Sequence, residues 1–377
     1  MTTSVPTPPA ATSQRVHAYV EAAGMASPLG PFVQACAAHR AGLDRFEGAR
    51  DFHYFAGDAN ERLELKVSAL PSATFGFAAA GRLVALACET FQDLREQLSP
   101  GALTRDTPLF LALPDPLALG MAVAPELERV EARRLDALGR RVLSVTFENL
   151  DWPWPGGPWH CFGGGHVAFA RALGAAGAWL ASTPGRACVV AAMDSLLDAS
   201  LLEALLRQQR LKTEDQPVGF TPGEAGVALL LRVPGRFPTD APKGRPLVEA
   251  VSLGRAPPEA PVDGRALAAC VRALRPYLPP ETGEPFWVSD HNGEELRALE
   301  WGTLQVVLRA EPLHWESFDA WYTAAGFGEL GVASGAVGVG LAVRALERKY
   351  APARAGIILS TDEDGNRAAV LLTSTAT

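Results

Sequence analysis

Short apolar runs alternate with longer amphipathic stretches along most of the chain. The apolar runs predict strands at 15–25, 107–114, 142–149, 186–195, 220–233, 285–290, 355–362 and 367–374. Apolar residues at helical spacing predict helices at 31–43, 125–141, 196–211, 264–278 and 293–309. Strands that alternate with helices in this way predict a layered α/β fold.

Two segments of the chain are similar at a fixed spacing, which predicts a duplication. "RACVVAAMD" at 186–194 and "RAGIILSTD" at 354–362 share a frame, with a shift of 168 residues (354 − 186). A stretch rich in Gly and Ala precedes each of them. Glycine in a helix interior costs about 1 kcal/mol relative to alanine, so helices with this many glycines are expected to be tightly buried. We therefore expect two similar halves with these small-residue helices at their centre.

Composition shifts divide the chain further. Pro, Gly and Lys break the pattern at 234–246, which predicts a linker between an N-terminal half at 16–235 and a C-terminal half at 246–377. The stretch 1–15 is polar and rich in Pro and Thr. It has no apolar centre, so we expect a disordered lead-in rather than a signal peptide.

Bulk composition excludes several function classes. The 377 residues are 48% hydrophobic and carry a net charge of -8, which argues against nucleic-acid binding. The five cysteines are scattered without CxxC pairs, which predicts neither a zinc site nor a disulfide framework and suits a reducing cytosol. No apolar run is long enough to span a membrane, and no His, Cys, Asp or Glu group has metal-ligand spacing. We expect a cytoplasmic protein without cofactor or metal.

A cysteine and a histidine flank a glycine run before the first small-residue helix, in "HCFGGGHVAFARAL" at 160–173. A thiolate gains from a helix N-terminus, so Cys161 is a candidate nucleophile with His160 as its base. Counting back from Asp194, however, places the helix start nearer His166, and a second interpretation therefore gives His166 a role in catalysis. A third interpretation makes Cys161 an ordinary buried thiol and His166 a capping or pocket residue. The residues alone leave all three open.

Two acidic residues and a tryptophan-rich tract have structural interpretations. Asp194 is expected to end a strand and to cap the helix that follows it. Glu224 in "TPGEAG" is expected to fix a turn or a buried hydrogen-bond network. The tract "LDWPWPGGPWH" at 150–160 cannot be regular structure, and its tryptophans are expected to cap a cavity or an interface.

Four of these segments, in this order, resemble the β-ketoacyl synthases, which are condensing enzymes of the thiolase fold. The segments are 20–46, 188–211, 218–232 and 326–346. The resemblance implies two duplicated halves, each with a five-stranded sheet, stacked as α-β-α-β-α layers. It also implies a dimer built across sheet edges, an acyl pocket, and a site made of one Cys on the first central helix and two His from the second half.

The departures from this family concern the site itself. Glu329 stands where the family has its Gly-His histidine, and the other family histidine falls on Asp290, with His291 one position away. In the family's register the nucleophile position is His166, whereas the internal repeat pairs Cys161 with Glu329. An ionised carboxylate accepts hydrogen bonds and cannot donate as an imidazole does. We therefore do not expect ordinary condensing chemistry.

Three functions follow from these observations. The first is a non-catalytic subunit, similar to a chain-length factor, in fatty-acid- or polyketide-type biosynthesis. It would form a homodimer or a heterodimer with a ketosynthase subunit and bind an acyl carrier protein. The second is an acyltransferase or thioester-processing enzyme that uses Cys161. The third is a scaffold protein that binds a partner through Trp152, Trp154 and Trp159.

Overall fold

The main sheet contains strands from both halves of the chain. The computed structural model describes residues 10–57, 61–121, 123, 130–154, 157–183, 186–233, 244–257, 264–311 and 315–374. Within these ranges ten strands form one sheet in the order β10-β9-β11-β12-β8-β1-β7-β6-β4-β5.

The N-terminal half lies before residue 234. Its strands in the main sheet are β1 (Ala11–Ala26), β4 (Leu109–Ala112), β5 (Trp159–Phe162), β6 (Ala187–Ser195) and β7 (Glu224–Arg232). Its helices are α1 (Phe32–Arg40), α2 (Pro71–Thr74), α3 (Ala80–Gln97), α5 (Glu131–Asn149), the 3₁₀ turn η1 (Gly165–Val167), α6 (Ala168–Ser182) and α7 (Ala199–Arg207). A separate hairpin consists of β2 (Glu47–Ala56) and β3 (Glu61–Val67).

The C-terminal half lies after residue 243. Its strands are β8 (Pro246–Arg255), β9 (Phe286–Ser289), β10 (Ala320–Tyr322), β11 (Ala355–Thr361) and β12 (Asn366–Ser374). Its helices are α8 (Arg265–Leu274), the 3₁₀ turns η3 (Arg275–Tyr277) and η4 (Pro280–Thr282), α9 (Glu295–Arg309), α10 (Ala324–Phe327), the 3₁₀ turn η5 (Gly331–Ala333) and α11 (Ser334–Glu347).

The two halves have the same strand pairing, so the duplication extends to the topology. In the N-terminal half, β1-β7-β6 are joined by antiparallel pairs, and β6-β4-β5 by parallel pairs. In the C-terminal half, β8-β12-β11 are antiparallel and β11-β9-β10 parallel. An antiparallel pairing of β1 with β8 joins the two sets. The predicted duplication is therefore present strand for strand.

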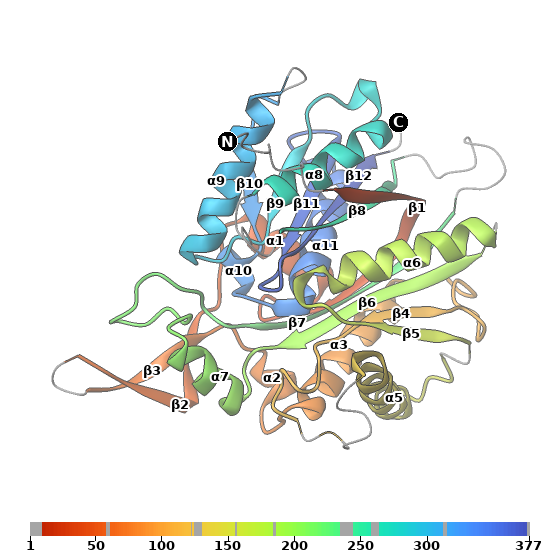
Figure 1. Ribbon diagram of the computed structural model, residues 1–377. Helices are drawn as coiled ribbons and strands as arrows, with labels where there is room; N and C mark the ends of the chain where they lie inside the picture. Colours follow the sequence, from red (N-terminus) through yellow and green to blue (C-terminus); the bar gives the residue numbers. More distant parts are fainter. Residues whose placement is uncertain are drawn as a thin grey trace.

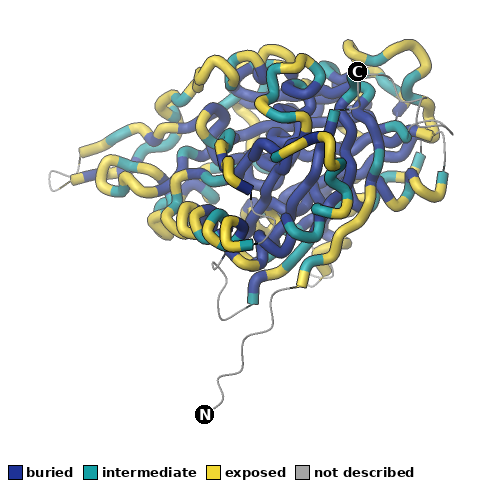
Figure 2. Tube along the Cα trace, turned by 90° about the horizontal axis from the view of Figure 1, so that it is seen from above, coloured by how far each residue is buried: buried dark blue, intermediate teal, exposed yellow. Residues whose placement is uncertain are grey.

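Helices and strands stack in five layers, as the resemblance implied. A core cluster packs α3 and α5 on one face of the N-terminal strands, and another packs α8 and α9 on the far face of the C-terminal strands. The largest core lies between the two sets of strands and contains α6 and α11 (Figure 1). Figure 2 shows this central region as an almost continuous buried mass with exposed segments around it.

Small residues in the central layer allow the helices to lie close to the strands, as expected. Twelve of the fourteen residues of α11 are buried. A Cβ on Gly338 would lie 3.0 Å from Ile358 and 3.2 Å from Val288. On the other face of the sheet, a Cβ on Gly24 of β1 would lie 2.3 Å from the backbone nitrogen of Leu94 in α3. Larger side chains at these positions would force the layers apart.

Two expectations about local structure are wrong. Strand β1 starts at Ala11, where its first residues pair with β8, so ordered structure begins before Val16. The segment 142–149 is not a strand, because α5 continues to Asn149. The buried residues Val142, Leu143, Thr146 and Phe147 continue the helical spacing of the preceding turns, and packing onto the sheet outweighs their β propensity.

The predicted boundary between the halves falls where the topology changes from one set of strands to the other. β7 ends at Arg232 and β8 begins at Pro246. Most of the predicted linker, 234–243, lies outside the described residues, as does most of the predicted lead-in, 1–9. The division into units at 16–235 and 246–377 therefore stays a prediction about boundaries.

The β2–β3 hairpin forms a side lobe that the hydrophobic pattern did not predict. Tyr54 and Leu65 of the hairpin pack against Leu202 and Leu205 of α7 and against Phe220. Figure 1 shows the hairpin projecting from the main sheet beside α7. The lobe therefore depends on contacts between segments that are more than 130 residues apart.

Candidate active site between the two central helices

The N-terminal ends of α6 and α11 meet at the centre of the molecule, and a 3₁₀ turn precedes each helix. Gly165 (φ +59°) opens the turn before α6, and Gly331 (φ +53°) opens the turn before α11. Left-handed φ values of this kind favour glycine. Asp194, at the end of β6, accepts a 2.8 Å hydrogen bond from the backbone N–H of Val332. Asp194 thus caps the α11 turn rather than α7, whose cap is Asp198.

His166 and Glu329 form the central contact of the site. The imidazole Nε2 lies 2.7 Å from Glu329 Oε1, and both side chains are buried. Glu329 also accepts hydrogen bonds from Asn292 Nδ2 (2.6 Å), from the backbone N–H of Gly331 (2.8 Å) and from Ser334 Oγ (3.1 Å). The carboxylate therefore has its acceptor positions filled by the protein itself.

Arg297 connects this pair to Asp290. Its Nη1 donates to Asp290 Oδ2 (2.9 Å) and to Thr361 Oγ1 (2.8 Å), and its Nη2 lies 3.3 Å from His166 Nε2. Asp290 also accepts from the Thr361 backbone N–H at 2.6 Å. Each cation of the cluster has its own carboxylate, Glu329 for His166 and Asp290 for Arg297, which compensates for the loss of water around these buried charges.

Burial acts against the charged forms of His166 and Glu329, but each stabilises the charge of the other. Burial acts to lower the pKa of His166, yet the Glu329 carboxylate raises it above its ordinary value. Burial acts to raise the pKa of the Glu329 carboxyl, yet His166, Arg297 and Asn292 hold it well below its usual range. Both shifts favour the charged forms, so the pair is best described as an imidazolium beside a carboxylate.

His291 lies apart from this cluster. Its ring packs edge-on against Tyr322, with the centroids 5.6 Å apart, and its Nδ1 has no hydrogen-bond partner among the described residues. Burial lowers its pKa. Asp290 and Asn292 face the cluster while His291 between them does not, which agrees with the expectation that a shift of one residue changes the face.

Cys161 is not at the helix N-terminus, so the first of the three interpretations is wrong. It lies in β5, seven residues before α6 begins at Ala168 (168 − 161). Side chains alternate along a strand, and Trp159 and Cys161 pack on the α5 side, whereas Phe162 packs against the central core. A Cβ on Gly139 of α5 would lie 2.3 Å from Cys161 Sγ. Burial raises the pKa of this thiol to about 12, so it is not an activated nucleophile.

The structure also settles the register that the repeat left open. The turn before α6 begins at Gly165 and the turn before α11 at Gly331, a shift of 166 residues (331 − 165). In this frame Cys161 does not correspond to Glu329. The shift of 168 holds for the strands, since β6 begins at Ala187 and β11 at Ala355. His166, not Cys161, occupies the start of the first central helix.

Sequence reasoning missed three members of the cluster: Asn292, Arg297 and Thr361. Asn292 was detectable, because alternate residues of an extended segment share a face and Asp290 was already a candidate. Arg297 and Thr361 carried no comparable signal. Arg297 lies 131 residues from His166 in the chain and 64 residues from Thr361, and it contacts both of them.

The tryptophan-rich tract packs within its own molecule. Trp154 is buried, donates its indole N–H to the Thr107 carbonyl at 3.0 Å and meets Phe147 edge-on at 5.2 Å. Trp152 lies under Arg95, and Trp159 under Arg140. Trp154 is thus a core residue, and the other two tryptophans are partly covered by arginines of their own chain.

Two kinds of feature are absent from the described part of the chain. No group of three or more His, Cys, Asp or Glu side chains is placed to hold a metal ion there. No helix in those ranges is both long enough and apolar enough to cross a membrane.

Solved structures with the same arrangement of layers come from polyketide biosynthesis. A type II polyketide synthase acyl-carrier protein in complex with its ketosynthase bound to the hexaketide matches with a TM-score of 0.71 at 12% identity, over 96% of this chain and 100% of that chain. The ishigamide ketosynthase/chain length factor matches with a TM-score of 0.63 at 16% identity, over 96% and 100%. The chain has the thiolase-type ketosynthase fold.

A third match to the ketosynthase fold is the oxazolomycin ketosynthase domain KS7 of Streptomyces albus JA3453. Its TM-score is 0.66 at 15% identity, over 96% of this chain and 74% of that chain. No family model matches the sequence, and no curated protein matches it. At these identities the likeness concerns the ketosynthase fold, and the chemistry has to be argued from the residues at the centre of this chain.

Proposed function

We propose that this chain is a non-catalytic ketosynthase-like subunit that pairs with an active condensing subunit. The observation that carries the proposal is the buried His166–Glu329 pair at the start of α6. Condensation needs a nucleophile there and donors for a developing oxyanion. A protonated imidazole is not a nucleophile. A carboxylate that already accepts from four donors has no N–H or O–H to donate to an oxyanion. The arrangement stabilises the fold rather than activating a thioester.

The partner surface is proposed to include the outer edge of β5. Among the described residues this strand ends the main sheet, and His160 is exposed on it while Phe162 packs against the core. An unpaired strand edge is a ready site for pairing with another chain. One similar structure is a ketosynthase/chain length factor, and another contains an acyl-carrier protein with its ketosynthase. A ketosynthase subunit and an acyl carrier protein are therefore the proposed partners.

The second candidate, acyl transfer by Cys161, has less support. The thiol packs on α5, on the opposite face of the sheet from α6, and its raised pKa disfavours the thiolate. The scaffold candidate also has less support, because Trp154 is buried in the core and is not available to a partner.

Acyl loading tests the proposal directly. The purified chain is incubated with hexanoyl-N-acetylcysteamine, an acyl thioester, and its intact mass is measured. We expect no covalent adduct on the wild type. An adduct that persists in Cys161→Ala would place a nucleophile elsewhere and overturn the proposal. An adduct that disappears in Cys161→Ala would establish the acyl-transfer alternative.

A further inference from the structure

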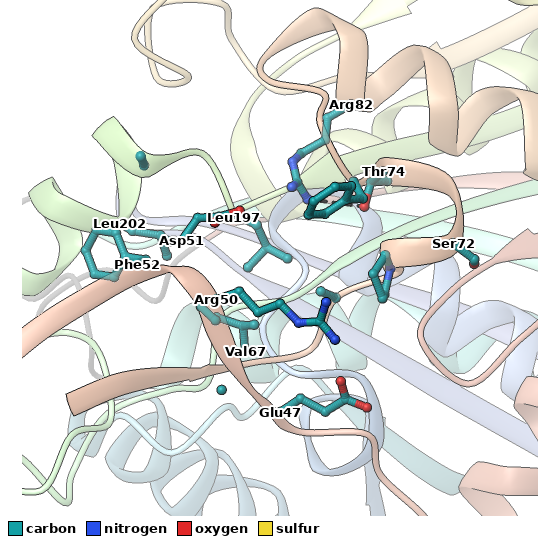
Figure 3. Close-up of a pocket in the computed structure, with 16 residues that line it drawn as sticks. Glu47, Arg50, Asp51, Phe52, Val67, Ser72, Thr74, Arg82, Leu197 and Leu202 are labelled. Atoms are coloured by element: carbon teal, nitrogen blue, oxygen red, sulfur yellow. Dashed lines mark hydrogen bonds between the residues drawn. The ribbon is translucent and has the colours of Figure 1, made fainter.

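A cavity of about 460 Å³ lies between the β2–β3 hairpin, α2 and the start of α7. Its volume falls in the range typical of small-molecule sites, about 300–1,000 Å³. Figure 3 shows side chains from all of these elements turned toward a common space. His166, Glu329, Asn292, Arg297 and Asp290 do not line it, so the cavity is separate from the central cluster.

The floor of the cavity carries a guanidinium held in a fixed position. Arg82 Nη1 donates to Glu224 Oε2 at 2.6 Å and to Thr74 Oγ1 at 3.3 Å. Glu224 is fully buried, and it also accepts from Ser195 Oγ at 2.8 Å and from the Leu70 N–H at 2.8 Å. The expected role of Glu224 in a buried hydrogen-bond network is thus observed. Its carboxylate holds Arg82 in place, which pre-organises the guanidinium.

One edge of this guanidinium is open. Among the described residues, neither Nε nor Nη2 of Arg82 has a hydrogen-bond partner, and the side chain is 16% exposed. Arg82 also lines the cavity, and we infer that its remaining N–H groups face that space. A guanidinium edge presents two parallel donors, a geometry that matches both oxygens of a carboxylate.

The walls and the mouth of the cavity differ in character. Phe52, Val67 and Leu202 contribute apolar wall, and Phe75 at the lining is 65% exposed. Arg50 points into the same space from β2, and it has no hydrogen-bond or ion-pair partner among the described residues (Figure 3). A partly apolar cavity with one guanidinium held in place and a second one at its lining suits a ligand that has both an apolar body and an anionic head.

We propose that this cavity binds an amphipathic carboxylate, with the carboxylate on Arg82 and Arg50 and the aliphatic body on the apolar wall. Glu47 and Asp51 also line the cavity, and their charges disfavour a dianionic phosphate head more than a monoanionic carboxylate. The site does not depend on the function proposed above, because it shares no residue with the His166–Glu329 cluster.

Calorimetric titration with decanoate tests the assignment on the full chain. We expect saturable binding with one site per chain, and at least tenfold weaker binding of decan-1-ol, which lacks the charge. Decyl phosphate is expected to bind more weakly than decanoate. Absence of saturable decanoate binding, or equal affinity for the alcohol, would overturn the proposal. Tighter binding of decyl phosphate would overturn the choice of a carboxylate head.

Variants at exposed positions locate the binding site without risk to the fold. Arg50→Glu reverses the charge at the mouth and is expected to weaken decanoate binding at least tenfold. Ala199→Trp, at the exposed first residue of α7, fills the mouth and is expected to abolish binding. Arg186→Glu makes the same charge change at an exposed position away from the cavity and should bind as the wild type does. Equal effects of Arg50→Glu and Arg186→Glu would show that the cavity is not the site.

Discussion

A single buried ion pair decides how the centre of this fold behaves. His166 and Glu329 occupy the meeting point of two helix N-termini, where backbone N–H groups favour negative charge and disfavour an imidazolium. The carboxylate satisfies that preference, and the imidazolium in turn is stabilised by the carboxylate. Removing either partner leaves the other buried and charged, which is more costly than the pair itself is favourable.

We predict that His166→Gln destabilises the protein by about 3 kcal/mol below neutral pH, the typical cost of breaking a buried pair. The pKa of His166 is raised above its ordinary 6.5, so the stabilisation is fully present below pH 6.5 and is lost as pH rises through the folded-state pKa. The pKa of Glu329 is lowered, so its contribution is present above 4.5 and is lost as pH falls through its folded-state value.

Urea unfolding at pH 5.5 and pH 9 measures this difference. The gap between wild type and His166→Gln should be larger at pH 5.5 than at pH 9, with unchanged m-values. A gap that grows with pH would contradict the charged-pair assignment. His53→Gln, on the β2–β3 hairpin, replaces a histidine far from the cluster and should show little effect at either pH.

The same pair predicts that a single substitution does not restore a nucleophile. His166→Cys would place a thiol at the start of α6, but the Glu329 carboxylate beside it would raise the thiol pKa. We predict that His166→Cys alone stays free of adduct with hexanoyl-N-acetylcysteamine, whereas His166→Cys with Glu329→His becomes acylated. Intact mass spectrometry distinguishes the two, and loading of the single variant would show that Glu329 does not suppress the thiolate.

Elements differ in how much of their structure the chain pattern reveals. The predicted strands at 186–195 and 355–362 are present, and each contains a short apolar run that is buried throughout the strand. The segment 142–149 misled the prediction because its β-branched residues also fit a helix that packs on a sheet. Cys161 misled it as well, since the glycine run that follows separates the strand from the helix.

Close packing between elements predicts opposite effects at two glycines. A Cβ on Gly24 would lie 2.3 Å from Leu94 N and 2.4 Å from Thr90 O, both backbone atoms of α3 that cannot move independently. We expect Gly24→Ala to destabilise the protein by 3 kcal/mol or more, at the upper end of about 1–3 kcal/mol for overpacking. Nothing lies within 4 Å of the position that a Cβ on Gly302, in α9, would take, so Gly302→Ala should stabilise by about 0.5–1 kcal/mol.

Thermal unfolding of the two variants is the measurement. The Gly24→Ala midpoint should fall by several degrees and the Gly302→Ala midpoint should rise. Equal behaviour of the two would mean that β1 and α3 adjust to each other, contrary to the tight contact described.

At the scale of the molecule, the duplication was the most predictable feature and the site the least. Two similar segments and two Gly- and Ala-rich helices sufficed to predict paired halves around a central layer, since small residues on buried helices have few other uses. The site depends on the contact of Arg297 with His166, which closes only when the two halves are assembled, and on the contact of Arg297 with Thr361, which lies 64 residues further along the chain. The β2–β3 lobe depends on α7 in the same way, and the pattern of either segment alone does not reveal it.

The outer edge of β5 gives the last prediction. If β5 pairs with the same strand of a second chain, the exposed His160 side chains of two antiparallel strands approach one another. We expect light scattering to give a dimer mass for the wild type and a monomer mass for His160→Glu, because like charges would then face each other across the new strand pair. His53→Glu makes the same change on the β2–β3 hairpin and should leave the dimer intact.

When an active ketosynthase subunit is coexpressed, it should compete for the outer edge of β5, so the homodimer would decrease as the mixed dimer forms. A wild-type chain that stays monomeric and also forms no mixed dimer would contradict the proposed subunit role. The buried ion pair at the helix start argues against catalysis, and the chain would then have no partner either.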